Sequence, residues 1–236
     1  MAIQIAMMAS KRAHPYAQES LKSMFERDEL DGVLVRVVAG ASDPEFLGPW
    51  KDDERVTVDL LDEETFQTYS SYPVCRRISE TFFRCLLPAA AAGDDLVLLQ
   101  DDVLCAHNWL KTTRVVFAEA RRRLLLRLQN PAAPVILALF SPQKYRGVDR
   151  PLAPYKPSRF YANIGLLFSA NTLPGLIELT KLRMGDMDDM IVKECILRGG
   201  ANLLAVNPSV IQHVGDASTH SCSYIRSPTF EECGHK

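Results

Sequence analysis

Three short apolar runs constrain the fold of this 236-residue chain more than any other feature. The runs are Ile3–Met8, Gly32–Gly40 and Asp95–Leu99. Each is far shorter than the roughly 20 residues that span a bilayer. The second run is also too apolar on both sides for a strand with one face in water, which is typical of a parallel strand covered on both faces. The runs therefore predict buried strands.

Helical spacing of apolar residues separates these runs. A helix is expected after Pro15, a second around Ile78–Leu86, and a long third over His107–Gln129. Strands are then expected at Val135–Phe140, Phe160–Phe168 and Leu203–Val206, with helices at Thr172–Leu182 and Asp188–Arg198. Such alternation predicts an α/β fold of the Rossmann-like kind, with a mostly parallel central sheet flanked by helices in a single domain.

Two polar segments interrupt this alternation. Residues 43–54 are rich in Asp and Pro and are expected to form a loop. Segment 141–159 contains Pro, Tyr, Lys and Arg and is long for a connection within a compact domain. Unstructured loops of that length are usually functional or disordered, and 141–159 is a candidate lid.

Composition limits the classes of partner. With 27 Lys and Arg against 29 Asp and Glu, the net charge is −2, which argues against a global positive field for nucleic acid or an anionic membrane. Arg121–Arg123 is interpreted as a solvated helix face, although it could dock an anionic partner. No apolar stretch is long enough to predict a membrane span, and the first apolar run has no basic residues before it, so a cytoplasmic protein is expected.

The six cysteines include no C-x-x-C pair, which argues against a zinc ribbon or a thioredoxin-like motif. Reduced thiols are expected inside a cell. The even count leaves disulfides open if the chain is a fragment of a secreted protein.

The first candidate site is Asp101-Asp102, which follows the third apolar run directly. Ligands of α/β sheets bind at the carboxyl ends of the strands. Two carboxylates there could hold Mg²⁺ or Mn²⁺, and the cation could hold a diphosphate. The alternative is a turn or helix cap before the helix that is expected near His107.

His213 lies after a short apolar run and before Gly215, and a neutral imidazole is a suitable further ligand for Mn²⁺. A surface or core histidine without function is the alternative. The cluster Asp186–Asp189 opens a predicted helix, where acids also simply complement the helix dipole. A general base is the functional interpretation, with Asp189 preferred because apolar residues follow it and Asp188 as the alternative.

Basic residues near the strand ends could bind phosphate. Lys11 and Arg12 follow the first strand, and Arg76 and Arg77 lie on the second predicted helix, with Arg76 as the chosen phosphate-binding residue. The planar fork of arginine suits phosphate oxygens. Solvated basic side chains are the alternative interpretation of both.

Two segments carry a resemblance to a known family. Leu98–Val103 looks like the acidic metal-binding motif of glycosyltransferases of the GT-A fold, with Gln100 in place of the first acid. Asn207–Gly215 is similar to the Pro-Ser-Leu-Phe-Gln-His-Val-Gly stretch of the N-acetylglucosaminyltransferases that add β-1,4 branches to N-glycans, the type-four family.

The resemblance implies a metal-dependent inverting glycosyltransferase that moves a sugar from a nucleotide-sugar to an acceptor hydroxyl. A UDP-sugar is expected, with UDP-GlcNAc as the first choice, and the cofactor is Mn²⁺ or Mg²⁺. The implied metal ligands are Asp102, His213 and Asp101, and the implied base is Asp189 or Asp188. The implied donor-binding residues are Ala9, Ser10, Lys11, Arg12, Arg76, Asp101, Asn163 and Gly165.

The resemblance also implies how the domain is divided. Residues 1–105 would form the nucleotide-sugar-binding half, and residues 106–236 the acceptor-binding half with the lid. The chain is short and has no expected membrane anchor, so the N-glycan acceptor is not carried over; the acceptor is a glycan or another hydroxyl compound, with nucleic acid left open in that role.

Two alternatives remain. One is a nucleotidyltransferase that makes nucleotide-sugars, although such enzymes usually have a glycine-rich loop after the first strand and Ala9–Arg12 contains no glycine. The other is an inactive carbohydrate-binding or scaffold protein of the same fold.

Overall fold

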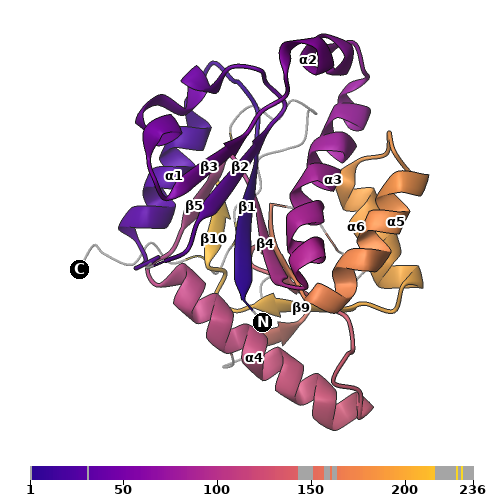
Figure 1. Cartoon of the computed structure of the whole chain (residues 1–236). Coiled ribbons are helices and arrows are strands. Elements are labelled where there is room, and N and C mark those ends of the chain that lie inside the picture. Colours follow the sequence, from indigo (N-terminus) through magenta and orange to yellow (C-terminus); the bar gives the residue numbers. More distant parts are fainter. Residues whose placement is uncertain are drawn as a thin grey trace.

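The central sheet has eight strands in the order β3-β2-β1-β4-β8-β6-β9-β7 (Figure 1). This computed structural model describes residues 2–30, 32–142, 151–156, 160, 164–215, 227 and 230. The strands are β1 (Ile3–Ala9), β2 (Val35–Ala39), β3 (Val56–Asp59), β4 (Asp95–Gln100), β6 (Val135–Ala138), β7 (Leu152–Pro154), β8 (Gly165–Phe168) and β9 (Asn202–Val206).

Most strands of this sheet run in one direction. β1 pairs in parallel with β2 and β4, β2 with β3, and β6 with β9. β8 lies antiparallel between β4 and β6, and β7 is antiparallel to β9 at the edge. The three apolar runs form β2, β1 and β4 side by side, which confirms the prediction of a mostly parallel central sheet.

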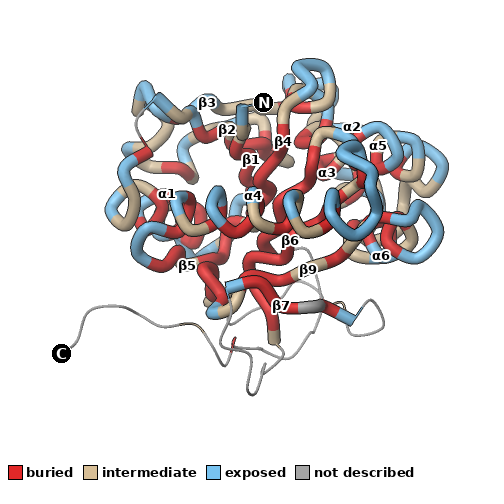
Figure 2. The backbone as a smooth tube through the Cα atoms, turned by 90° about the horizontal axis from the view of Figure 1, so that it is seen from below, coloured by how far each residue is buried: buried red, intermediate tan, exposed pale blue. Residues whose placement is uncertain are grey.

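Helices cover both faces of the sheet, as predicted. One apolar core cluster joins alternate strand residues such as Met7 and Leu99 to the helices α1 (Tyr16–Glu26) and α4 (Trp109–Leu128). The preceding residue on each strand, Ala6 or Leu98, points to the opposite face. There it joins a second cluster with α3 (Val74–Ala92), α5 (Leu173–Leu182) and α6 (Asp188–Arg198). Figure 1 shows α1 on one side of the strands and α3, α5 and α6 on the other. The central strands are buried on both sides because two helical layers cover them (Figure 2).

Several short elements depart from the prediction. Most of the expected loop at 43–54 is a 3-10 segment, η1 (Pro44–Asp52), which is kinked at Gly48. The helix α2 (Glu63–Ser70) was not predicted, although Asp62 caps it by accepting from the backbone N–H of Thr65 at 2.8 Å. A short 3-10 turn, η3 (Ala170–Thr172), precedes α5.

A second, two-stranded sheet was also not predicted. It pairs β5 (Val103–Cys105) with β10 (Ile211–His213) in antiparallel register. These strands are too short for a periodic pattern, and they form because distant parts of the chain meet at the edge of the core.

The segment predicted as a lid is only partly described. Its residues 152–154 form β7, an edge strand of the central sheet, and the neighbouring Tyr155 is buried. That part is therefore sheet rather than lid. Residues 143–150 and 157–159 lie outside the described residues, and for them the lid stays a prediction.

Two further features bear on the sequence predictions. Within the described ranges, no helix is both long enough and apolar enough to cross a lipid bilayer. Cys75, Cys85, Cys105 and Cys195 are free thiols, and burial raises the pKa of Cys195 to about 11. Cys222 and Cys233 lie outside the described residues.

Packing of α3 on the sheet generates a stability prediction. Phe82 is fully buried, and its ring meets that of Phe168 edge to face at 6.4 Å. Phe82→Ala is expected to lower the free energy of unfolding by about 3–5 kcal/mol, measured by urea denaturation, because it leaves a cavity. Leu87→Ala on the same helix is the control, since Leu87 is 41% exposed and its loss should cost about 0.5 kcal/mol. Equal losses for the two variants would contradict this packing.

Candidate functional site

A cavity of about 320 Å³ lies at the carboxyl ends of β1, β2 and β4. Ligands of open α/β sheets bind at this edge because the strand ends and the loops that follow them converge there. The cavity is lined by Met8–Arg12, Gly40, Tyr69, Val74, Arg77, Ile78, Thr81, Gln100–Asp102, Met187, Asp188 and His213. Most of the residues that the sequence predicted for a site are therefore brought to one place.

Arg12 binds both members of the acidic pair. Its Nη2 lies 2.8 Å from Asp101 Oδ1, and its Nη1 lies 3.0 Å from Asp102 Oδ2. The backbone N–H of Ser10 also donates to Asp101 Oδ2 at 2.8 Å. The loop after β1 thus supplies a positive charge and a backbone donor to two buried carboxylates that follow β4.

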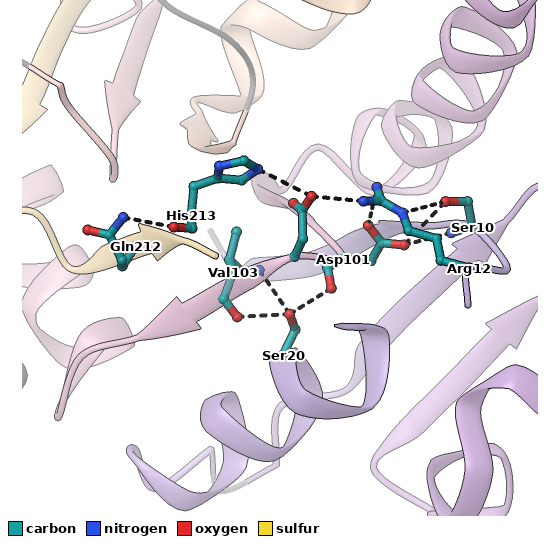
Figure 3. Close-up of polar contacts among 8 residues, drawn as sticks. Ser10, Arg12, Ser20, Asp101, Val103, Gln212 and His213 are labelled. Carbon is teal, nitrogen blue, oxygen red and sulfur yellow. Dashed lines mark hydrogen bonds and ion pairs between the residues drawn. The ribbon is translucent and has the colours of Figure 1, made fainter. Parts of the chain in front are cut away.

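His213 approaches the same pair from the other side. Its Nε2 lies 3.2 Å from Asp102 Oδ2, and Figure 3 shows Arg12 and His213 on opposite sides of the acidic residues. The pairing of His213 with Val103 across β5 and β10 fixes this placement, as does the bond from Val214 N to the Asp102 carbonyl at 2.9 Å. The sequence prediction that Asp102 and His213 converge is thus met by the geometry.

Ser20 of α1 supports the bend between the acidic pair and β5. Its Oγ lies 2.8 Å from the carbonyl oxygens of both Asp101 and Val103, and it accepts from Val103 N at 3.0 Å (Figure 3). Because Ser20 is fully buried, its hydroxyl rather than water satisfies these backbone groups. The helix therefore holds the acidic pair in position through one side chain.

The two carboxylates differ in acidity. Burial raises the pKa of Asp101 to about 6, and the Asp102 charge adds to the shift while Arg12 opposes it. Burial also opposes the ionisation of Asp102, yet His213 and Arg12 together hold the pKa of Asp102 below its ordinary value. Asp102 is therefore the member of the pair that carries the more persistent negative charge.

The donor atoms fit a divalent cation. Asp102 Oδ1 is buried and has no hydrogen-bond partner among the described residues. Asp102 Oδ2 already contacts Arg12 Nη1 at 3.0 Å and His213 Nε2 at 3.2 Å, so Oδ1 is the oxygen that a cation would use. Carboxylate oxygen with imidazole nitrogen suits Mn²⁺, and carboxylate oxygen suits Mg²⁺. Asp101 is already held by Arg12 and Ser10.

The protein supplies few ligands of its own. In the described ranges, no group of three or more His, Cys, Asp and Glu side chains is arranged to hold a metal ion. A cation at Asp102 and His213 would take its remaining ligands from water and from substrate oxygens, which is usual for Mg²⁺ beside phosphates.

The structure distinguishes the two predicted bases. Asp188 begins α6, is buried and lines the cavity, whereas the partly exposed Asp189 does not line it. The apolar residues that follow Asp189 do not bury it as expected. Met190 is 49% exposed, and the buried side chains of Ile191 and Val192 lie on the same face of α6 as Asp188. Asp188, the second choice from sequence, is the acid at the site.

Of the predicted donor-binding residues, some line the cavity and others do not. Ala9, Ser10 and Lys11 line the cavity with Arg12 and Asp101. Gly165 does not line it: a Cβ there would lie 3.2 Å from Leu99 Cδ2, so the close approach at Gly165 is to the core. Asn163 lies outside the described residues.

Arg76 does not line the cavity either. It is exposed, and its guanidinium stacks 3.9 Å from the ring centre of Tyr72. Its neighbour Arg77 lines the cavity, and Arg77 Nε is buried with no hydrogen-bond partner in the described part of the chain. One position along a helix turns a side chain by about 100°, so of the two neighbouring arginines only Arg77 reaches the cavity.

Tyr69 and Gly40 line one side of the cavity, and neither residue was predicted from the sequence. Tyr69 Oη lies 2.8 Å from Thr81 Oγ1 and donates to the Arg77 carbonyl at 3.0 Å. A Cβ at Gly40 would lie 2.3 Å from Tyr69 Oη, so the glycine permits this contact. The signal in the sequence was Gly40 at the end of an apolar run, but Tyr69 lies on α2, which was not predicted.

Comparisons with known proteins bear on the fold. No family model matches the sequence, and no curated protein matches it. Among solved structures, the fold is similar to the apo structure of the bifunctional glycosyltransferase WbbM, with a TM-score of 0.50, 8% identity and 86% of this chain covered. The chain shares the fold of the aligned part of WbbM. It spans 38% of the length of the WbbM chain.

A second solved structure is the galactosyltransferase LgtC in complex with donor and acceptor sugar analogues. It aligns with a TM-score of 0.41 and 14% identity over 85% of this chain and 72% of that chain. The resemblance to the type-four N-acetylglucosaminyltransferases is not tested by these two matches and stays a prediction.

The close packing of Gly215 on Asp102 generates a prediction about cation binding. A Cβ at Gly215 would lie 2.4 Å from Asp102 Oδ2, so Gly215→Ala must displace the carboxylate. Displacing a ligand in this way is expected to weaken Mn²⁺ binding by about 10–100-fold, measured from the electron paramagnetic resonance signal of free Mn²⁺.

Gly175→Ala on α5 is the control, because a Cβ there meets nothing within 4 Å. Wild-type Mn²⁺ affinity in a folded Gly215→Ala protein would show that Asp102 is not a ligand.

Proposed function

We propose that this chain is a metal-dependent glycosyltransferase that moves a sugar from a nucleotide-sugar to an acceptor hydroxyl. One observation carries the proposal: buried Asp101 and Asp102 meet Arg12 and His213 at a cavity on the carboxyl edge of the sheet. The fold that the chain shares with the aligned part of WbbM adds support. UDP-GlcNAc is the first donor to test, and Mn²⁺ or Mg²⁺ is the proposed cofactor.

The charges at the cavity suit a nucleoside diphosphate. Lys11, Arg12 and Arg77 line it as cations, and Arg77 Nε has no acceptor among the described residues. Arginine binds phosphate oxygens through two parallel hydrogen bonds. A divalent cation held by Asp102 and His213 would neutralise the negative charge that develops on the leaving diphosphate.

Asp188 is the proposed general base. Its carboxylate accepts the proton of the acceptor hydroxyl as the hydroxyl oxygen bonds to the anomeric carbon. The bond from that carbon to the diphosphate oxygen breaks, and the diphosphate leaves with the electron pair. A single displacement of this kind inverts the anomeric configuration, as the resemblance implies.

The acceptor class and location complete the proposal. The acceptor is a hydroxyl-bearing compound such as a glycan, and it would enter beside Asp188 and Met187 because these residues line the cavity from α6 and the turn before it. The cytoplasm is the proposed location.

Donor turnover tests the reaction class. With UDP-GlcNAc and Mn²⁺, the protein is expected to release UDP, and Asp102→Asn should lower the rate at least 100-fold by weakening the site for the cation and the diphosphate. The readout is UDP release by coupled assay, run with a panel of nucleotide-sugars. Formation of nucleoside triphosphate from pyrophosphate would instead identify a nucleotidyltransferase. No cation-dependent nucleotide binding and no effect of Asp102→Asn would identify an inactive scaffold.

A pair of neighbouring variants tests the base. Asp188→Asn is expected to lower kcat by about 10²–10⁴-fold with little change in the donor KM, because the amide cannot accept the proton. Asp189→Asn is the matched control one residue away, and its kcat should stay within about twofold. A larger loss in Asp189→Asn than in Asp188→Asn would assign the role to the other acid.

A further inference from the structure

The helix α4 carries a concentration of positive charge that the proposed reaction does not use. Its 20 residues include six Lys and Arg side chains and a single acid, Glu119. The whole chain has 27 basic and 29 acidic side chains, so the positive charge of α4 is balanced by an excess of acids elsewhere. The basic residues are Lys111, Arg114, Arg121, Arg122, Arg123 and Arg127.

Large apolar side chains are exposed on the same helix. Val115 is 64% exposed and Leu126 is 69% exposed, and Leu125 and Leu128 are also exposed. The opposite face of α4 is buried on the sheet through Trp109 and six other residues, so these exposed side chains are additional to the core face. Val115, Arg122 and Leu126 follow one another at helical spacing on the outer face.

Three of these six cations form ion pairs with described residues and three do not. Glu119 binds Arg122 at 2.7 Å and Arg123 at 2.6 Å, and Arg121 binds Asp95 at 3.3 Å. Lys111, Arg114 and Arg127 form no ion pair with any described residue. A helix face that only meets water normally carries both signs of charge in similar numbers, whereas α4 has six cations and one acid.

The position of α4 makes this face accessible. In Figure 1 the helix runs along the lower edge of the molecule, and in Figure 2, seen from below, it crosses in front of the sheet. Its last turns contain Leu125, Leu126 and Leu128, interleaved with Arg127. A flat surface could therefore meet the whole length of α4.

We propose that the outer face of α4 binds the surface of a membrane that contains anionic lipids. Aliphatic side chains interleaved with cations fit the boundary between headgroups and acyl chains, where leucine is buried and Lys and Arg meet lipid phosphate. A nucleic acid would favour exposed aromatic side chains for stacking, and the exposed apolar residues of α4 are aliphatic. This inference does not depend on the proposed reaction.

Vesicle sedimentation tests the inference. The full chain is expected to bind vesicles that contain phosphatidylserine in phosphatidylcholine, to bind pure phosphatidylcholine vesicles weakly, and to dissociate as KCl is raised. Each cation near an anionic surface contributes about a fivefold factor in partitioning, so Lys111→Gln with Arg114→Gln, which removes two exposed cations outside any ion pair with the described residues, should lower binding about 30-fold. Leu125→Ser with Leu126→Ser should also lower binding, at all salt concentrations.

The matched control is Lys193→Gln with Leu182→Ser, which removes an exposed cation and an exposed leucine from α6 and α5. It should bind as the wild type does, and circular dichroism should show that all variants are folded. Equal binding to both kinds of vesicle, or wild-type binding by the α4 variants, would overturn the proposal. Tighter binding to single-stranded RNA than to anionic vesicles would also overturn it.

Discussion

The ion pairs between Arg12 and the two buried carboxylates are the interaction on which the rest of the site depends. Asp101 and Asp102 are adjacent, nearly inaccessible to water, and placed at the end of β4, whose first five residues are buried. Two carboxylates cannot both stay ionised there without countercharge and hydrogen-bond donors. Arg12, Ser10 and His213 supply them, so the loop after β1 and the strand β10 are tied to the end of β4.

This requirement explains why elements distant in the sequence converge. β1 and β4 are neighbours in the sheet, so the loop after one meets the acidic pair after the other. Ser20 joins the same bend to α1, and the pairing of β5 with β10 brings His213 into reach. The resulting arrangement leaves Asp102 Oδ1 buried without a partner among the described residues, and this orphaned oxygen is the observation that supports the proposed cation site.

The sequence predicted what depends on long periodic patterns. The apolar runs identified β1, β2 and β4, and the position of Asp101-Asp102 directly after β4 identified the edge of the sheet where the cavity lies. Single residues on helices were less predictable, because the choice between Asp188 and Asp189 or between Arg76 and Arg77 depends on where the helix begins. The pairs of short strands, and with them Gly215 against Asp102, arise from long-range contacts that leave no local pattern.

The net charge of the whole chain did not reveal how charge is distributed over its surface. An overall value of −2 argued against an anionic partner, yet the charges are separated in space, with six cations on α4 and two acids at the cavity edge after β4. Averaging over the chain conceals both features. Each becomes visible only when the structure shows which side chains share a surface.

Paramagnetic relaxation by Mn²⁺ tests the central claim most directly, because it reports distance from the ion. With UDP present, Mn²⁺ at substoichiometric amounts is expected to broaden the imidazole resonances of His213 at a lower Mn²⁺ concentration than those of His14 and His107. Assignments would come from His213→Asn. Equal broadening of all histidines, or selective broadening of His14 or His107, would contradict a cation site at Asp102 and His213.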